Sequence, residues 1–193
     1  MLTPRFVDAL AHAFELHQEQ FRKQTEIPYI SHLMSVSALV LEDGGDEDEA
    51  IAALLHDAAE DQGGTPVLET IRGKFGDAVA RIVEACSDSM TENPTEKAPW
   101  VDRKRTYLAH LKAETRIGVL RVSAADKLHN ARAVLSDYRD VREELWRRFN
   151  GGRDGTLWYY RSLADVLKQS GCVPRLAAEL DRTVSELERL AAR

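Results

Sequence analysis

Metal-binding and acid–base side chains gather in the stretch Ala50 to Asp61, which reads AIAALLHDAAED. His56 and Asp57 stand side by side after an apolar run, and Glu60 and Asp61 follow one helical turn later. Positions i, i+3 and i+4 share one face of a helix, so Asp57, Glu60 and Asp61 are expected on one side, with His56 about 100° away. The pattern predicts a cation held by the His-Asp pair, with two further carboxylates in reach. The alternative is an apolar helix that turns polar near its end, where the histidine and the acids are solvated. Because the negative end of a helix disfavours acids, we also expect a compensating positive charge nearby.

Two further candidate ligands stand elsewhere in the chain. His32 begins a predicted helix shortly after Pro28, and the positive end of that helix favours the neutral, metal-binding form of the imidazole. Asp126 lies in the middle of a predicted buried helix, where an unpaired carboxylate is too costly, so it needs a partner. Asn130 falls on the same face at i+4, with His129 at i+3. The alternatives are a capping or packing histidine and a salt-bridged core aspartate.

Helical periodicity runs along the whole sequence and no convincing strand alternation occurs, so we expect an all-α fold. The first helix is predicted from Pro4, behind an N-cap at Thr3, to Phe21. A second begins at His32, for which Ser31 is a candidate cap. Further helices are expected at residues 46–61, 67–75, 77–86, from 100 onward, 117–135, 138–149, 157–169 and 175–192.

Four polar, basic or aromatic segments stand out along this helical sequence. Residues 42–49, EDGGDEDE, predict a solvated loop, because their spacing lacks that of an EF-hand. Residues 87–99 form the longest polar segment, expected to be either a lid beside the site or a surface excursion. The basic run at 103–105 predicts a solvated face or an anion-attracting patch. The aromatic cluster at 158–160 is expected in the core rather than on a base-stacking surface.

Length and charge exclude several classes of protein. A chain of 193 residues suits one domain with a core of ordinary size. The net charge of −6 argues against a general nucleic-acid binder, and no apolar run approaches the roughly 18 to 20 residues of a membrane span. The N-terminus is predicted to be an amphipathic helix rather than a secretory leader. We therefore expect a cytoplasmic protein. Because Cys86 and Cys172 stand far apart and in no metal spacing, we expect them to be buried or idle thiols.

The four candidate ligands follow the order H…HD…D, which resembles the HD-domain metal-dependent phosphohydrolases. Several motifs are similar to the hydrolase domain of the RelA/SpoT alarmone enzymes, which removes pyrophosphate from the 3′ position of guanosine tetra- and pentaphosphate. These motifs are Arg22-Lys23, PYISH at 28–32, HDAAED at 56–61, FGDAVARIV at 75–83 and ADKLHNAR at 125–132. The resemblance covers residues 10–165 and leaves no room for synthetase, TGS or ACT regions. It implies a single-domain HD helical bundle over residues 1–193, like the stand-alone metazoan SpoT homologues.

The resemblance also implies roles for individual residues. The implied ligands of a divalent ion, Mn²⁺ or another first-row metal, are His32, His56, Asp57 and Asp126. The implied pair that orients or deprotonates the attacking water is Glu60 and Asp61. The nucleotide contacts are expected to be Arg22, Lys23, Lys127, Asn130 and Tyr159, the last through a loose alignment. His129 stands where relatives also carry tyrosine, so it is not counted as a ligand.

The expected activity is Mn²⁺-dependent hydrolysis of guanosine-3′,5′-bis(diphosphate), ppGpp, or its pentaphosphate to GDP or GTP plus pyrophosphate. The partner is therefore a small-molecule nucleotide, with no nucleic acid and no membrane. Two departures from the family pattern leave the exact nucleotide open: Leu33 replaces a proline, and Cys86-Ser87-Asp88 replaces Val-Thr-Lys. The alternatives are an HD phosphohydrolase acting on another nucleotide, such as NADPH or a nucleoside monophosphate, and a non-catalytic alarmone-binding protein.

Overall fold

Helices make up the regular structure of the computed structural model, which describes residues 1–87 and 98–192. They are α1 (Pro4–His17), α2 (Ile30–Glu42), α3 (Glu47–Leu55), α4 (Ala58–Gln62), α5 (Gly64–Phe75), α6 (Asp77–Cys86), α7 (Trp100–Ala113), α8 (Ile117–Val141), the 3₁₀ helix η2 (Arg142–Arg148), α9 (Gly152–Ser170) and α10 (Pro174–Ala191). Over the described ranges, the exception is an isolated β-bridge between Phe21 and Pro28. The all-α expectation is confirmed.

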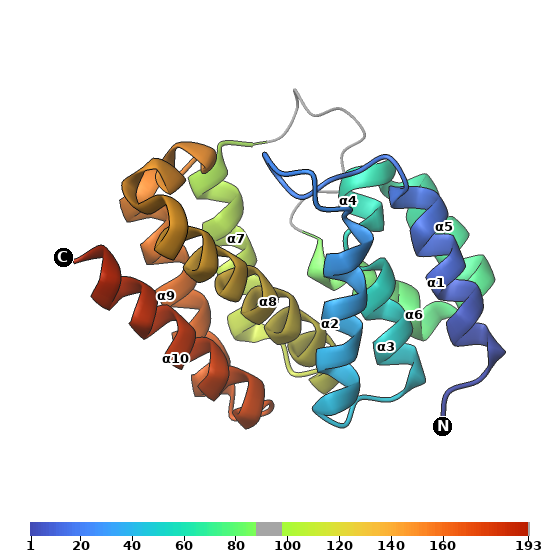
Figure 1. Cartoon of the computed structure of the whole chain (residues 1–193). Coiled ribbons are helices and arrows are strands. Elements are labelled where there is room, and N and C mark those ends of the chain that lie inside the picture. The colour runs from blue at the N-terminus through green and yellow to red at the C-terminus, as the bar shows by residue number, and fades with distance from the viewer. Residues whose placement is uncertain (88–97, 193) are drawn as a thin grey trace.

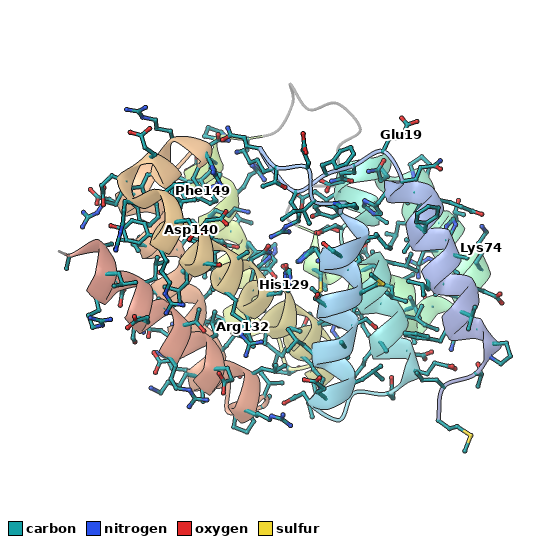
Figure 2. The ribbon with its side chains drawn as sticks, in the orientation of Figure 1. Glu19, Lys74, His129, Arg132, Asp140 and Phe149 are labelled. Atoms are coloured by element: carbon teal, nitrogen blue, oxygen red, sulfur yellow. The ribbon has the colours of Figure 1, made fainter. Side chains whose placement is uncertain are left out.

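The long helix α8 forms the centre of the fold. Figure 1 shows α1–α6 on one side of it and α7, α9 and α10 on the other, and α8 packs against both groups. Leu120 and Leu128 of α8 are fully buried, and truncating such a leucine to alanine typically costs about 2–5 kcal/mol. His129, labelled in Figure 2, lies where α8 faces α2. The core therefore fixes the position of α2 relative to α8, and with it the polar side chains between them.

The segment that carries the His-Asp motif is two helices, and the prediction of one helix over residues 46–61 is wrong. His56 is the C-cap of α3, and Asp57 is the N-cap of the five-residue α4. Adjacent residues of one helix point about 100° apart. The break instead brings Nε2 of His56 within 3.1 Å of Oδ2 of Asp57. It also places Glu60 and Asp61 in the first turn of α4, where the positive helix end favours carboxylates.

The entry to α2 also differs from the prediction. Helix α1 ends at His17, and Phe21 leaves the helix to pair with Pro28. This bridge folds residues 22–27 into a turn. Ser31 does not cap α2, because the N-cap position belongs to Tyr29 and has no side-chain cap. His32 nevertheless lies in the first turn of α2, as the sequence predicts.

The C-terminal half follows its predicted boundaries except around η2. Helix α8 runs on to Val141 and ends where Arg142 takes a positive φ of 51°, so the helix predicted over 138–149 is divided between α8 and η2. Helix α9 begins at Gly152, earlier than the predicted start at residue 157. Gly76, with a φ of 91°, separates α5 from α6 as predicted, because this conformation suits glycine. Helices α7 and α10 are confirmed.

One expectation concerns the polar segment at residues 87–99, and another concerns membrane crossing. Residues 88–97 lie outside the described residues, so the prediction of a lid or a surface excursion at 87–99 stays a prediction. Among the described helices, none is both long enough and apolar enough to cross a membrane.

Candidate metal centre and nucleotide pocket

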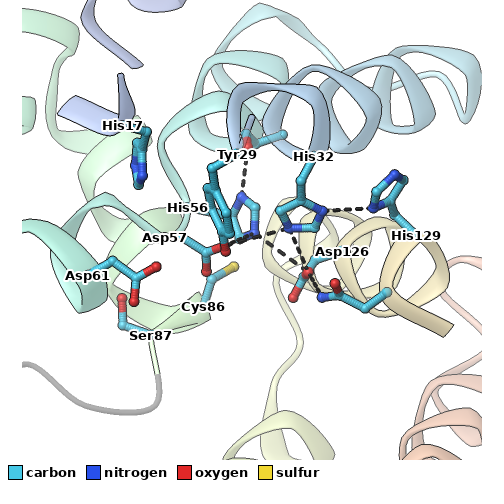
Figure 3. Close-up of polar contacts among 12 residues, drawn as sticks. His17, Tyr29, His32, His56, Asp57, Asp61, Cys86, Ser87, Asp126 and His129 are labelled. Atoms are coloured by element: carbon cyan, nitrogen blue, oxygen red, sulfur yellow. Dashed lines mark hydrogen bonds and ion pairs between the residues drawn. The ribbon is translucent and has the colours of Figure 1, made fainter. Parts of the chain in front are cut away.

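Three parts of the chain bring the four predicted ligands together. His32 comes from the first turn of α2, His56 and Asp57 from the break between α3 and α4, and Asp126 from the middle of α8. The Nε2 atom of His32 lies 3.3 Å from Oδ1 of Asp126 and 3.6 Å from Oδ2 of Asp57. The Nε2 atom of His56 lies 3.1 Å from Oδ2 of Asp57 and 3.6 Å from Oδ1 of Asp126. Figure 3 shows the four side chains converging on one point.

The chemistry of this cluster fits a divalent metal ion. Nε2 of His32 and Nε2 of His56 are both buried, and neither has a hydrogen-bond partner. Buried polar atoms are almost always paired, so two such nitrogens facing two carboxylates fit the coordination of a cation. His32, His56 and Asp57 each offer one ligand atom within 4.8 Å of the others. Two imidazoles and two carboxylates form a mixed nitrogen and oxygen set that suits first-row ions such as Mn²⁺ or Zn²⁺ better than Ca²⁺.

The charges of the cluster make its metal affinity sensitive to pH. Burial alone would lower the pKa of His56. The nearby carboxylates of Asp57 and Asp126 outweigh burial and raise this pKa well above its usual value. Burial likewise opposes ionisation of Asp57, but His56 and His32 hold the pKa of that carboxyl well below its usual range. A proton and a metal ion therefore compete for the same nitrogen of His56.

Hydrogen bonds from outside the cluster orient both carboxylates. Tyr29 donates its hydroxyl to Oδ2 of Asp57 at 2.6 Å. Asn130 donates Nδ2 to Oδ1 of Asp126 at 2.5 Å, and the Lys127 ammonium donates to Oδ2. Burial alone would lower the pKa of Lys127, but the carboxylate of Asp126 raises it well above its usual value, so this lysine is charged. Such outer contacts fix the direction in which a ligand oxygen points.

Both imidazole rings are held through their Nδ1 atoms. Nδ1 of His56 lies 2.8 Å from the carbonyl oxygen of Ala53, which can only accept a hydrogen bond. Nδ1 of His32 lies 2.8 Å from Nδ1 of His129. Burial and the neighbouring His32 and Arg22 lower the pKa of His129 to about 4, so this ring is neutral near pH 7. In both His32 and His56, Nε2 is thus the atom that faces the two carboxylates.

The predicted acid pair lies next to the cluster, on α4. Nε2 of Gln20 donates to Oδ2 of Asp61 at 2.9 Å, and Gln20 in turn accepts from Gln62 at 2.6 Å. Figure 3 shows Asp61 on the Asp57 side of the site. Nη1 of Arg103 lies 3.9 Å from Oε1 of Glu60, which is the compensating positive charge that the sequence called for.

A cavity of about 610 Å³ opens beside the cluster, a size typical of small-ligand sites. The five predicted nucleotide contacts all line it, namely Arg22, Lys23, Lys127, Asn130 and Tyr159. His129 and Lys104 line the same cavity. Its wall is therefore rich in cations, although the whole chain is acidic.

Two contacts connect this cavity to the cluster of His32, His56, Asp57 and Asp126 and to the aromatic residues. Nη2 of Arg22 donates to Oδ1 of Asn130 at 2.7 Å, so Asn130 bridges Arg22 and the carboxylate of Asp126. Tyr159 is buried as predicted, but its hydroxyl has no hydrogen-bond partner and its ring lies under Nζ of Lys104 at 5.1 Å. A phosphorylated ligand in the cavity would meet both charged donors and aromatic rings.

Sequence reasoning missed several residues of this site. Tyr29 precedes His32 by three positions in the motif PYISH, and this spacing on one helix turn was the available signal. Gln20 and Gln62 carry no local signal, because their roles come from contacts across 41 and 42 positions. The contact of His129 with His32 carries no local signal either, because the two residues are 97 positions apart.

Known proteins resemble this chain in sequence and in fold. The family described as HD domain matches residues 9–157. Guanosine-3′,5′-bis(diphosphate) 3′-pyrophosphohydrolase MESH1 of Xenopus tropicalis is 38% identical over 143 residues, which are 72% of this chain and 73% of that protein. The probable guanosine-3′,5′-bis(diphosphate) 3′-pyrophosphohydrolase of Synechocystis is 37% identical over 134 residues, which are 65% of this chain but 16% of that longer protein.

A solved structure, described as a metazoan ortholog of SpoT that hydrolyses ppGpp, superposes on this chain with a TM-score of 0.77. The alignment covers 97% of each chain at 24% identity, so this likeness bears on the fold.

Proposed function

The chain belongs to the HD-domain family, and on this premise we propose that it is a metal-dependent guanosine-3′,5′-bis(diphosphate) 3′-pyrophosphohydrolase. Its substrates are ppGpp and pppGpp, and its products are GDP or GTP plus pyrophosphate. The observation that carries the proposal is the pair of unpartnered Nε2 atoms, on His32 and His56, that face two carboxylates beside a cation-lined cavity.

The proposed ligands of the ion are His32, His56, Asp57 and Asp126, and we propose Mn²⁺ as the ion. Their mixed nitrogen and oxygen donors support this choice. When bound, such an ion supplies Lewis acidity, which polarises a phosphoryl group and makes water more acidic. The neighbouring donors Tyr29, Asn130 and Lys127 hold the two carboxylates in position for it.

In the proposed reaction, water attacks the phosphorus attached to the 3′ oxygen. The bond between this phosphorus and the 3′ oxygen breaks, pyrophosphate leaves, and the 3′ oxygen takes up a proton from solvent to become the hydroxyl of GDP or GTP. Glu60 is the proposed acceptor of the water proton, with Asp61 orienting the water. Support comes from the position of both acids in the first turn of α4, directly after Asp57. Gln20 donates a hydrogen bond to the Asp61 carboxylate, and Nη1 of Arg103 lies 3.9 Å from Oε1 of Glu60.

The cavity supplies the proposed nucleotide site. Arg22, Lys23 and Lys127 would neutralise the phosphates, because charge-assisted hydrogen bonds to phosphate are strong where water is excluded. Asn130 and Tyr159 are the proposed contacts to the ribose or base. The unpartnered hydroxyl of the buried Tyr159 supports this role, because a ligand would supply its missing partner.

The proposal extends to the whole chain and its surroundings. We propose one HD-type domain over residues 1–193, which is supported by the packing of α10 against α8 and α9. A cytoplasmic location agrees with the two cysteines, Cys86 and Cys172, which are free thiols.

A nucleotide panel tests the substrate. The purified chain is incubated with Mn²⁺ and ppGpp, pppGpp, NADPH or GMP, and the products are separated by anion-exchange chromatography. We expect GDP and pyrophosphate from ppGpp, and no product from a matched Asp57→Asn variant. Preferred turnover of NADPH or GMP would instead indicate another HD phosphohydrolase, and binding of ppGpp without turnover would indicate a sensor.

A further inference from the structure

His129 lies at the boundary between the ligand cluster and the nucleotide cavity. It belongs to α8, three residues after Asp126, and its half-buried ring also lines the cavity. Figures 2 and 3 show it facing the α2 side of the site, where its ring meets that of His32 at a centroid distance of 4.8 Å. Its Nδ1 atom lies 2.8 Å from Nδ1 of His32. Both atoms are imidazole Nδ1 nitrogens, so the direction of the hydrogen bond depends on which of the two rings carries the proton on Nδ1.

A neutral imidazole carries one N–H, so one Nδ1 of this pair must donate and the other must accept. If Nδ1 of His32 accepted, its proton would sit on Nε2 and point at the carboxylates of Asp57 and Asp126. That nitrogen could then bind no metal ion. If Nδ1 of His32 donates, Nε2 presents its lone pair to the same point. Only the second arrangement is compatible with the proposed metal centre.

The other histidine ligand shows the same arrangement with a different acceptor. Nδ1 of His56 lies 2.8 Å from the carbonyl oxygen of Ala53, so Nδ1 must be the donor and Nε2 is left for a ligand. His32 is fully buried, and its Nδ1 is paired with an imidazole nitrogen rather than with a carbonyl oxygen. The Nδ1 lone pair of His129 takes the place that a backbone oxygen takes for His56. Metal-binding histidines generally use their second nitrogen in this way.

We propose that His129 is a positioning residue, which accepts a hydrogen bond from Nδ1 of His32 and so holds the His32 ring with Nε2 free to bind the divalent ion. His129 does not bind the ion itself. This inference rests on the proposed metal centre and adds to it a residue that the ligand motif does not contain.

The contact can be observed directly by nuclear magnetic resonance. The protein is labelled with ¹⁵N in histidine and loaded with Zn²⁺, a diamagnetic first-row ion. We expect the His32 Nδ1 to carry a proton and to show scalar coupling across the hydrogen bond to an unprotonated Nδ1 of His129. A proton on Nδ1 of His129, or the absence of coupling between the two nitrogens, would overturn the proposal without any variant.

Two substitutions separate the acceptor from the bulk of the side chain. His129→Leu removes the acceptor, whereas His129→Asn can place Oδ1 where Nδ1 of the imidazole was. We expect His129→Leu to weaken Mn²⁺ binding on the order of 10- to 100-fold in isothermal titration calorimetry, the range found for outer partners of metal ligands. His129→Asn should retain most of the affinity. His110→Leu, a change at an exposed histidine of α7, is the matched control and should bind Mn²⁺ like the wild type.

The outcomes distinguish this inference from the function it rests on. Equal affinity in His129→Leu and the wild type, or equal losses in the Leu and Asn variants, would refute the role of His129 and leave the metal centre standing. A wild-type protein that binds neither Mn²⁺ nor Zn²⁺ would refute the metal centre and this inference together.

Discussion

Tyr29→Phe removes one hydrogen bond from the proposed ligand Asp57 and little else. The hydroxyl of Tyr29 donates to Oδ2 of Asp57 at 2.6 Å, and this oxygen also faces both histidine ligands. The ring of Tyr29 stacks on His17 at a centroid distance of 5.3 Å and meets His32 edge-on at 5.5 Å. Phenylalanine can keep both ring contacts. The substitution therefore tests the hydrogen bond rather than the packing.

The size of the effect follows from the acceptor and its exposure. A hydrogen bond to a charged group is worth about 1.5–3 kcal/mol. The Asp57 side chain is 23% exposed, so water can partly replace the lost donor and the lower end applies. We expect the metal-free protein to lose about 1.5 kcal/mol of unfolding free energy. We expect Mn²⁺ affinity to fall about tenfold, because the carboxylate loses a contact that orients it.

A second tyrosine in the chain provides the control. The Tyr138 hydroxyl donates to Oε1 of Glu143, also at 2.6 Å, but this pair joins α8 to η2 and does not line the nucleotide cavity. Tyr138→Phe should leave Mn²⁺ affinity unchanged. Denaturant unfolding gives the stability of each variant, and isothermal titration calorimetry gives its affinity. If the two variants bound Mn²⁺ equally well, the hydrogen bond from Tyr29 would have no part in positioning Asp57.

Glu60→Gln should retain Mn²⁺ binding but slow pyrophosphate release by about 10²–10⁴-fold, because it removes the proposed proton acceptor and none of the ligands; full turnover with saturating ppGpp would exclude Glu60 as the base. Asp126→Asn should weaken Mn²⁺ binding by more than roughly 100-fold, the upper end for residues that only hydrogen-bond to a metal ligand, because a charged ligand is lost. Unchanged Mn²⁺ affinity in isothermal titration calorimetry would remove Asp126 from the ligand set. Arg22→Gln should raise KM by about 10- to 100-fold through the loss of a charge-assisted contact, whereas a change confined to kcat in steady-state assays would argue against a binding role. Hydrogen bonds from Arg116 hold the pKa of Glu114 to about 2, so this carboxylate stabilises the fold above pH 4.5 and the contribution is lost as the pH falls toward 2. Thermal unfolding of Glu114→Gln and the wild type should therefore differ at pH 7 and converge near pH 2, and a constant difference would contradict this assignment.

The ligand set illustrates which features of the site a sequence can predict. His56 and Asp57 are adjacent ligand types, and Asp126 is a carboxylate in an apolar helix that requires a partner, so both signals are local. The packing of α2 and α3 against α8 then brings Nε2 of His56 to 3.6 Å from Oδ1 of Asp126. Helical periodicity also predicted the class of the fold and most helix positions, because each helix buries one apolar face.

The features that were missed depend on contacts between distant residues. The break at residues 56–57 was not predicted, because the alanine-rich motif favours a continuous helix. At the break, Asp57 faces His32 of α2 and His56 faces Asp126 of α8, and the local sequence does not specify these tertiary contacts. Tyr29 and Gln20 likewise act through residues 28 and 41 positions away, which no local pattern reveals.

The most direct test of the proposed metal centre is an anomalous diffraction map from crystals of the protein soaked in Mn²⁺. We predict one strong peak whose nearest protein atoms are Nε2 of His32, Nε2 of His56 and a carboxylate oxygen from each of Asp57 and Asp126. A peak elsewhere, or a peak at the His56-Asp57 pair that leaves His32 or Asp126 unbound, would contradict the proposed site.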